Sequence, residues 1–384
     1  MEIYIIAELI MLFFVLISRN ASDRQCNIFL AITCVMWALI FGLRGHDVGN
    51  DTPGYTGFFE LTNSNYGESY GTYEAPGESI EWGYVILNRF LALFSDSATF
   101  LFLVHGIFLM SMIYLIYKDN RYSVMSMIWM LTFGNTISML MVALRQSYSI
   151  CFVLLSILLI EKASQQCTEK RELVHLRFFW GGVICFIFAM TIHRTSLILF
   201  PLLVILYFVH VNKRIIFSVL TLVFICSLIL SNYISDMFDM AMVLVGGIEN
   251  DKISLIADRY GSEMENSGAS LVSKLALCLP IYLATYFTDE EKINTLLFKC
   301  LIFSIVLFLL FSSSLVITRI TLLFVVIGYS VIIPSVVVDD EDNKRIYILY
   351  LLFTVYYLWR AFVHFAADLE SLNNTYILYK FVWE

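Results

Sequence analysis

The feature that most constrains the fold is a series of long apolar runs that recur along the chain. Several approach or reach the ~20 residues with which a helix crosses ~30 Å of hydrocarbon; they include residues 3–17, 28–43, 139–160, 215–230, 295–311 and 315–338. Hydrophobic residues make up 59% of the chain and charged residues only 15%. The runs lack the two-residue alternation of a membrane-barrel strand, and a helix satisfies its own backbone amides in lipid. The sequence therefore predicts an all-α polytopic membrane protein.

We expect about twelve membrane-spanning helices, within a range of about ten to fourteen. They are predicted near residues 3–18, 27–43, 97–117, 122–133, 139–161, 178–191, 195–211, 214–230, 271–287, 294–312, 316–338 and 346–364. The run 122–133 is short for a full span, and Asn135 and Ser138 indicate a tight turn after it. The first run has no basic segment before it and no small-residue cleavage site after it, so we expect a retained helix rather than a signal peptide.

Lysine and arginine mark one side of the membrane, because alternate short connections carry them, as cytoplasmic loops do. These residues are Arg19, Arg24, Lys118, Arg121, Lys162, Lys170, Arg171, Arg177, Lys213, Arg214, Lys292, Lys344 and Arg345. Both termini are then expected outside. Two long outer segments, 44–96 and 231–270, are rich in Gly, Ser, Asn, Tyr and acidic residues. The sequence predicts one transmembrane domain, residues 1–384, with two outer loop regions.

Four arginines oppose this charge bias, because Arg44, Arg145, Arg194 and Arg319 each fall at the outer edge of an apolar run. One interpretation is that each side chain snorkels to lipid headgroups or pairs with an acidic residue. Guanidinium groups also bind phosphate oxygens in a bidentate manner. Four of them at comparable depth, on four different helix ends, favour a shared anion site.

The outer segment that follows the second predicted helix is typical of a folded binding loop. Residues 44–55 combine glycines, which permit tight turns, with the polar side chains of Arg44, Asp51 and Tyr55. Asp51 is equally suited to cap a short helix that carries Tyr55 and Phe59 on one face. The two interpretations are compatible.

Polar residues at three other places interrupt apolar sequence. Glu81 precedes an apolar helical stretch, where a carboxylate suits the helix N-terminus or acts as a general base. Arg145 and Gln146 are expected two turns inside the outer end of the fifth helix, a costly depth for a charge unless it faces a polar cavity. His193 adjoins Arg194 between two apolar helices. A lone histidine is often structural, but this one is placed to accept a proton near neutral pH.

The sequence offers no metal site and no cofactor motif. The eight cysteines are scattered, mostly within apolar runs, with no C-x-x-C spacing. No His/Cys cluster indicates an obligatory metal. The formal net charge of −8 opposes a general nucleic-acid surface.

Four short blocks follow one another along the chain. They are Arg44…Gly49-Asn50-Asp51-Thr52…Tyr55, Glu81-x-Gly83-Tyr84…Leu87-Asn88, Arg145-Gln146 and His193-Arg194-Thr195-Ser196-Leu197. In this order they resemble the motifs of EpsG-type proteins, which belong with the Wzy polysaccharide polymerases of bacterial inner membranes. The resemblance covers roughly residues 1–365 as an architecture, and its first block is the most specific. Asn50 departs mildly from the Gly or small residue that the family usually has there.

The resemblance implies an enzyme, a glycosyltransferase that polymerises oligosaccharide repeat units carried on undecaprenyl diphosphate. The growing glycan leaves its lipid diphosphate and joins the non-reducing end of a new lipid-linked repeat, at the periplasmic face of the inner membrane. A type C glycosyltransferase-like architecture without cofactor or metal is expected. The expected partners are the lipid-linked oligosaccharide, membrane lipid and a chain-length regulator protein, and no nucleic acid.

Such a reaction needs cations for the departing diphosphate and a base for the proton of the acceptor hydroxyl. The expected substrate-binding residues are Arg44, Tyr55, Arg145, Gln146, Arg194 and Arg319, and the candidates for the base are His193, Asp51 and Glu81.

Two alternatives are open. An O-antigen ligase moves the same donor onto a lipid A core, and a basic acceptor surface is expected of it, whereas the outer segments here are acidic. A lipid-linked oligosaccharide flippase or other transporter should place charges along a path open to both sides and contain an internal repeat. We find no repeat, and the charges cluster at one face.

Overall fold

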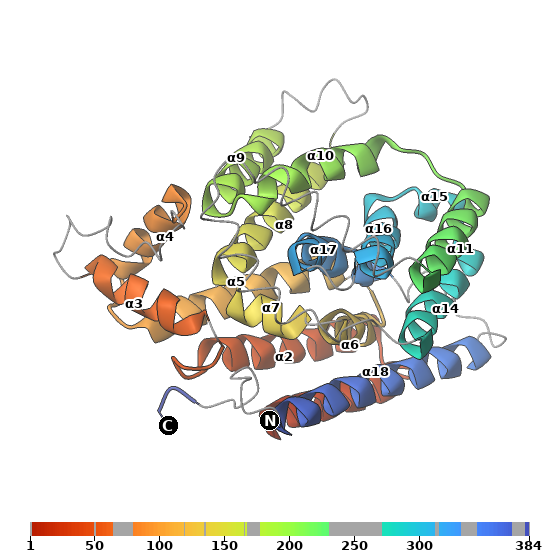
Figure 1. Ribbon diagram of the computed structural model, residues 1–384, viewed down its shortest axis with the longest axis horizontal. Coiled ribbons are helices and arrows are strands. Elements are labelled where there is room, and N and C mark those ends of the chain that lie inside the picture. The colour runs from red at the N-terminus through yellow and green to blue at the C-terminus, as the bar shows by residue number, and fades with distance from the viewer. Residues whose placement is uncertain are drawn as a thin grey trace. The chain divides into compact units, whose positions relative to one another are not determined.

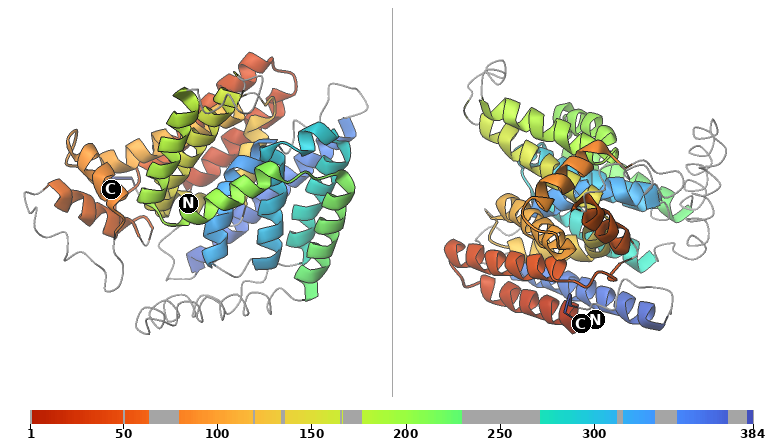
Figure 2. Two further views of the ribbon diagram at one scale, coloured as in Figure 1. Left: turned by 90° about the horizontal axis from the view of Figure 1, so that it is seen from above. Right: turned by 90° about the vertical axis from the view of Figure 1, so that its left-hand side faces the viewer.

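The computed structural model describes residues 2–49, 51–63, 80–118, 120–133, 136–164, 166, 177–229, 271–311, 315–331, 344–370 and 381–383, and nearly all of them lie in helices (Figure 1; Figure 2). They fall into two compact units. Unit 1 comprises Met1–Leu202 and Tyr356–Glu384, and unit 2 comprises Leu203–Val355. The predicted outer segment 231–270 lies outside the described residues.

Helices occupy the predicted apolar runs. Unit 1 contains α1 Glu2–Ser18, α2 Asp23–Gly42, α3 Thr52–Asn63, α4 Trp82–Ala92, α5 Ala98–Tyr117, α6 Ser123–Thr132, α7 Thr136–Val142, α8 Leu144–Ser164, α9 Arg177–Ile192 and the start of α10 Thr195–Phe208. Unit 2 contains the end of α10, α11 Lys213–Ile229, α14 Leu271–Phe287, α15 Glu290–Ile293, α16 Leu296–Phe311, α17 Leu315–Gly328, a 3-10 turn Tyr329–Val331 and the start of α18 Lys344–Glu370.

Among the described residues, four helices are long and apolar enough to cross a membrane: α2, α5, α8 and most of α18. A fifth span results if α6 and α7, which are bent by 80° at their break, count as one. Shorter apolar helices lie in both units, including α9, α10, α14, α16 and α17. The chain is therefore an all-α, multi-pass membrane protein, and the count of about twelve spans stays a prediction.

Polar contacts join loops that the charge pattern assigns to the same side of the membrane. In unit 1, the Arg121 guanidinium donates to the carbonyl oxygens of Arg19 and Ala21, at 3.0 and 3.1 Å. In unit 2, the Asn294 side-chain amide bonds to the backbone N–H and the carbonyl oxygen of Val211, at 2.9 and 2.8 Å. Within each unit, these loops with basic residues lie at one end of the helices.

The predicted helix 139–161 is wrong in one respect, because α7 and α8 are separated at Ala143. Ser147 Oγ donates to the carbonyl oxygen of Leu140 at 2.8 Å, so the hydroxyl binds a carbonyl of the preceding helix. Arg145 and its neighbour Gln146 therefore lie in the first turn of α8 and not two turns inside a helix. Residues 139–147 include no Gly or Pro, so the sequence carries no helix-breaking residue at this point.

The helices α3, α4, α5, α8 and α9 share an apolar core in unit 1 that is rich in aromatic side chains. Its buried members are Phe58, Phe59, Tyr84, Leu91, Ala98, Leu101, Phe102, Leu144, Tyr148 and Ile192. At the start of α4, a Cβ on Gly83 would lie 2.6 Å from the carbonyl carbon of Thr191 and would also meet its Oγ1. Only glycine allows α4 to approach α9 this closely. That contact brings the start of α4 to the C-terminal end of α9.

Candidate active site

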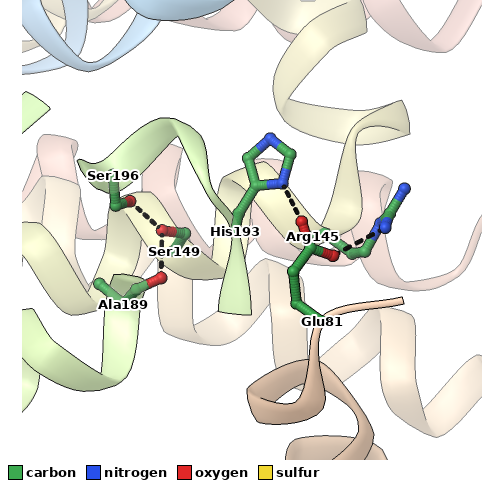
Figure 3. Close-up of polar contacts among 6 residues, drawn as sticks. All are labelled: Glu81, Arg145, Ser149, Ala189, His193 and Ser196. Atoms are coloured by element: carbon green, nitrogen blue, oxygen red, sulfur yellow. Dashed lines mark hydrogen bonds and ion pairs between the residues drawn. The ribbon is translucent and has the colours of Figure 1, made fainter. Parts of the chain in front are cut away.

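Three residues from separate parts of unit 1 form one ionic cluster (Figure 3). Arg145 Nη1 donates to Glu81 Oε2 at 2.8 Å, and His193 Nδ1 lies 3.3 Å from Glu81 Oε1. Glu81 is the N-cap of α4, Arg145 is in the first turn of α8, and His193 lies in the short break before α10. The three side chains are 10%, 20% and 16% exposed. The cluster is thus largely shielded but keeps some exposed surface.

The electrostatics of the cluster keep Glu81 ionised. Burial acts to raise the pKa of Glu81, but the hydrogen bond with His193 and the charge of Arg145 outweigh it and lower the pKa from 4.5 to about 2. A carboxylate with so low a pKa is a weak proton acceptor at neutral pH. Its position suits it to hold the other two side chains.

The His193 ring has one nitrogen engaged and one directed elsewhere. Nδ1 faces Glu81, while the second ring nitrogen, Nε2, points away from the carboxylate (Figure 3). A proton on Nδ1 is donated to Glu81, which leaves Nε2 able to accept a proton. The pair can therefore act as an oriented base whose imidazolium form is stabilised by a neighbouring carboxylate.

A buried serine pair fixes the backbone beneath His193. Ser149 Oγ donates to the Ala189 carbonyl oxygen at 3.0 Å, and the His193 backbone N–H donates to the same oxygen at 3.1 Å. Ser149 Oγ is also hydrogen-bonded to Ser196 Oγ (Figure 3). Since Ser149 has one proton, which goes to Ala189, Ser196 donates in the bond between the two serines.

Sequence reasoning did not single out Ser149. Its signal was its spacing, because a residue four positions after Arg145 lies on the same face of a helix. The serine pair connects α8, which carries Arg145, to the helix break that carries His193.

The predicted loop contributes Tyr55 to the cluster. Tyr55 lies in α3, its side chain is hydrogen-bonded to Arg145, and its ring packs edge-on against Tyr84 with 5.9 Å between centroids. Asp51 precedes the first residue of α3 and is partly buried, one turn before Tyr55. The structure thus brings together Tyr55, Glu81, Arg145 and His193, which the sequence proposed from four separate blocks.

The four predicted arginines occupy different environments. Arg194 is exposed beside His193, and Gln146 is buried beside Arg145. Arg319 lies in α17, in unit 2. Arg145 is thus the arginine that the structure places in the ionic cluster.

Arg44 lies in the core of unit 1 with no exposed surface. Its Nη1 donates to the Phe41 carbonyl oxygen at 3.2 Å, and its guanidinium lies 4.4 Å from the centre of the Phe102 ring. Its backbone pairs with Phe381 in a β-bridge. This position suits Arg44 to hold the start of the loop that leads to α3.

Among the described residues, no group of three or more His, Cys, Asp or Glu side chains is placed to hold a metal ion. The positive groups of the cluster come from arginine and from the N-terminal ends of α4, α8 and α10. Such helix ends favour negative charge.

Comparison with known proteins assigns the chain to a family. A family model described as the EpsG family matches residues 27–381, which is most of the chain. Neither a search of curated proteins nor a search of solved structures gives a match. The matched range includes every residue of the ionic cluster. The chain belongs to the EpsG family and is a membrane protein of the polysaccharide-polymerase type.

Proposed function

We propose that this protein polymerises lipid-linked oligosaccharide repeat units at the periplasmic face of the bacterial inner membrane. It transfers the growing glycan from undecaprenyl diphosphate to the non-reducing end of a new lipid-linked repeat. The observation that carries this proposal is the Glu81–Arg145–His193 cluster, in which the three side chains come from the starts of three helices. The chain that holds this cluster is a member of the EpsG family. About twelve spans in a type C glycosyltransferase-like architecture would surround it.

The acceptor side of the reaction is assigned to His193. The acceptor hydroxyl gives its proton to Nε2 as its oxygen forms the new bond to the anomeric carbon. Glu81 holds the ring through Nδ1 and stabilises the imidazolium that results. The low pKa of Glu81 favours this role over that of the base itself. Asp51, on the neighbouring loop, is the second choice for the base.

The donor side is assigned to the arginines. The bond between the anomeric carbon and the diphosphate oxygen breaks, and its electron pair leaves with the diphosphate. Negative charge then grows on the leaving group, where preorganised cations and N–H groups are most effective. Arg145, held by Glu81, and the exposed Arg194 lie close to His193, and Tyr55 orients the Arg145 guanidinium. The positive ends of the α8 and α10 helix dipoles add to the attraction for phosphate.

The expected partners follow from this reaction. They are the lipid-linked oligosaccharide as donor and acceptor, the surrounding membrane lipid, and a protein that sets chain length.

A cell experiment separates this function from its alternatives. Cells that make the cognate glycan and carry His193→Ala should deliver single repeat units to the surface instead of a ladder of lengths. A matched control is His210→Ala, a change to an exposed histidine beyond the end of α10, which should leave the ladder intact. Accumulated lipid-linked polymer would indicate a ligase, and single units trapped inside the cell would indicate a flippase. Either result contradicts the proposal.

A further inference from the structure

The short helix α4 has two unlike faces. One face is buried in unit 1 and consists of Gly83, Tyr84, Asn88 and Leu91. The other face exposes large apolar side chains at a spacing of four residues, namely Trp82 at 61%, Ile86 at 46% and Phe90 at 56% exposure, and Leu93 and Phe94 continue it past the helix end. Residues four apart lie above one another on a helix, so these side chains form one stripe.

Both ends of α4 adjoin helix ends that the charge pattern assigns to the outer side of the membrane. At its start, Gly83 contacts Thr191, the last residue but one of α9. After its end, only Ser95, Asp96 and Ser97 separate Phe94 from the first residue of the membrane-spanning helix α5. The charge pattern puts the end of α9 and the start of α5 on the same, outer side. An eleven-residue helix is about 16 Å long, too short to cross ~30 Å of hydrocarbon.

We infer that α4 is an interfacial helix and that the stripe formed by Trp82, Ile86 and Phe90 is embedded in the outer leaflet, at the boundary of headgroups and acyl chains. The occupant of this surface is membrane lipid, because only residues 95–97 separate the stripe from α5, a membrane-spanning helix that lipid surrounds. Tryptophan favours this depth, and the exposed Arg89 beside the stripe provides a cation at the level of lipid phosphates.

An embedded α4 sets the depth of the candidate site in the membrane. Glu81 directly precedes Trp82, so an embedded α4 fixes the ionic cluster at headgroup depth. A diphosphate attached to a membrane lipid lies at that depth without leaving the bilayer. The placement of α4 itself rests on its exposed face and its two ends, and not on the proposed reaction.

Depth measurement by spin labelling tests the placement. In a variant without the eight native cysteines, Phe90→Cys is labelled with a nitroxide and the protein is reconstituted in phosphatidylethanolamine–phosphatidylglycerol vesicles. Controls are Glu60→Cys, exposed on α3, and Ile107→Cys, exposed near the middle of α5. The label at position 90 should be more accessible to oxygen than to an aqueous nickel complex, at a depth between those of the two controls.

Three results would overturn the inference. Nickel accessibility at position 90 equal to that at position 60 would place the stripe in water, and a depth equal to that at position 107 would place it in the middle of the bilayer. Low accessibility to both reagents would indicate that a second protein chain covers the stripe. The same measurement on the His193→Ala protein should give an unchanged depth. The depth of α4 and the proposed reaction are therefore tested separately, so that failure of one does not decide the other.

Discussion

Glu81 Oε1 lies 3.3 Å from Nδ1 of His193, although 112 residues separate the two in the chain. The other oxygen of the same carboxylate accepts from Arg145, so Glu81 holds a histidine and an arginine in one geometry. The contact joins the N-cap of α4 to the break between α9 and α10. In the proposed mechanism, His193 needs Glu81 to orient its ring, and Glu81 acts only through the side chains that it holds.

Glu81→Gln should therefore reduce turnover while the protein stays folded. Glutamine keeps the shape and one acceptor oxygen, but it removes the negative charge that stabilises the His193 imidazolium and pairs with Arg145. Loss of an oriented general base costs on the order of 10²-fold or more in rate. Initial rates of glycan elongation by purified protein measure the effect, and an unchanged rate would remove Glu81 from the mechanism.

The same carboxylate predicts a dependence of stability on pH. Its pKa is lowered from 4.5 to about 2 in the folded protein, so the unfolded chain binds the proton more readily. The stabilisation is complete above about pH 4.5 and is lost as the pH falls toward 2. Between pH 6 and pH 3, the melting temperature of wild-type protein in detergent should fall more than that of Glu81→Gln. Parallel curves for the two proteins would contradict the lowered pKa.

Gly83→Ala should disturb the site without touching an ionisable group. The added Cβ meets Thr191 of α9, so α4 must shift and carry Glu81 away from His193. Gly54→Ala is a matched control, since Gly54 also lies in a short helix and its Cβ would have nothing within 4 Å. We expect elongation to be lost in the first variant and kept in the second, which should gain about 0.5–1 kcal/mol in stability. Equal activity in both variants would show that the close approach is not required.

Ser149→Ala should lower turnover with little change in KM, because it loosens the helix break that carries His193. Ser196 then loses its acceptor, at a cost of about 1 kcal/mol in stability. Ser156→Ala on the same helix is the control, since the Ser156 hydroxyl is buried and has no hydrogen-bond partner among the described residues. A double-mutant cycle with Ser196→Ala should show coupling, whereas additive effects would contradict the serine pair.

The apolar runs were sufficient to locate the longer helices, because a span of hydrocarbon demands a long apolar segment. They predicted residues 97–117 for α5, which runs Ala98–Tyr117. The break at Ala143 escaped prediction, because it depends on the hydrogen bond from Ser147 to Leu140 and not on a Gly or Pro.

The polar residues of the site were predictable as candidates but not as a geometry. Arg44 and Arg145 both lie at the edge of an apolar run, and the sequence alone does not distinguish their environments. Tertiary packing separates them, since Arg44 is buried on Phe102 while Arg145 reaches Glu81. Ser149 was missed because a serine inside an apolar helix gives no sign of the carbonyl that it binds.

The central claim is that this protein elongates lipid-linked glycans and that His193 accepts the acceptor proton. The most direct measurement supplies purified, reconstituted protein with repeat units on undecaprenyl diphosphate and follows glycan length by mass spectrometry from pH 6 to 9. Wild-type protein and His210→Ala should produce lipid-linked dimers and longer chains with release of undecaprenyl diphosphate, and His193→Ala should produce none at comparable folded amounts. Full elongation by His193→Ala would show that His193 is not the base. Absence of elongation by folded wild-type protein would contradict the proposed polymerase activity.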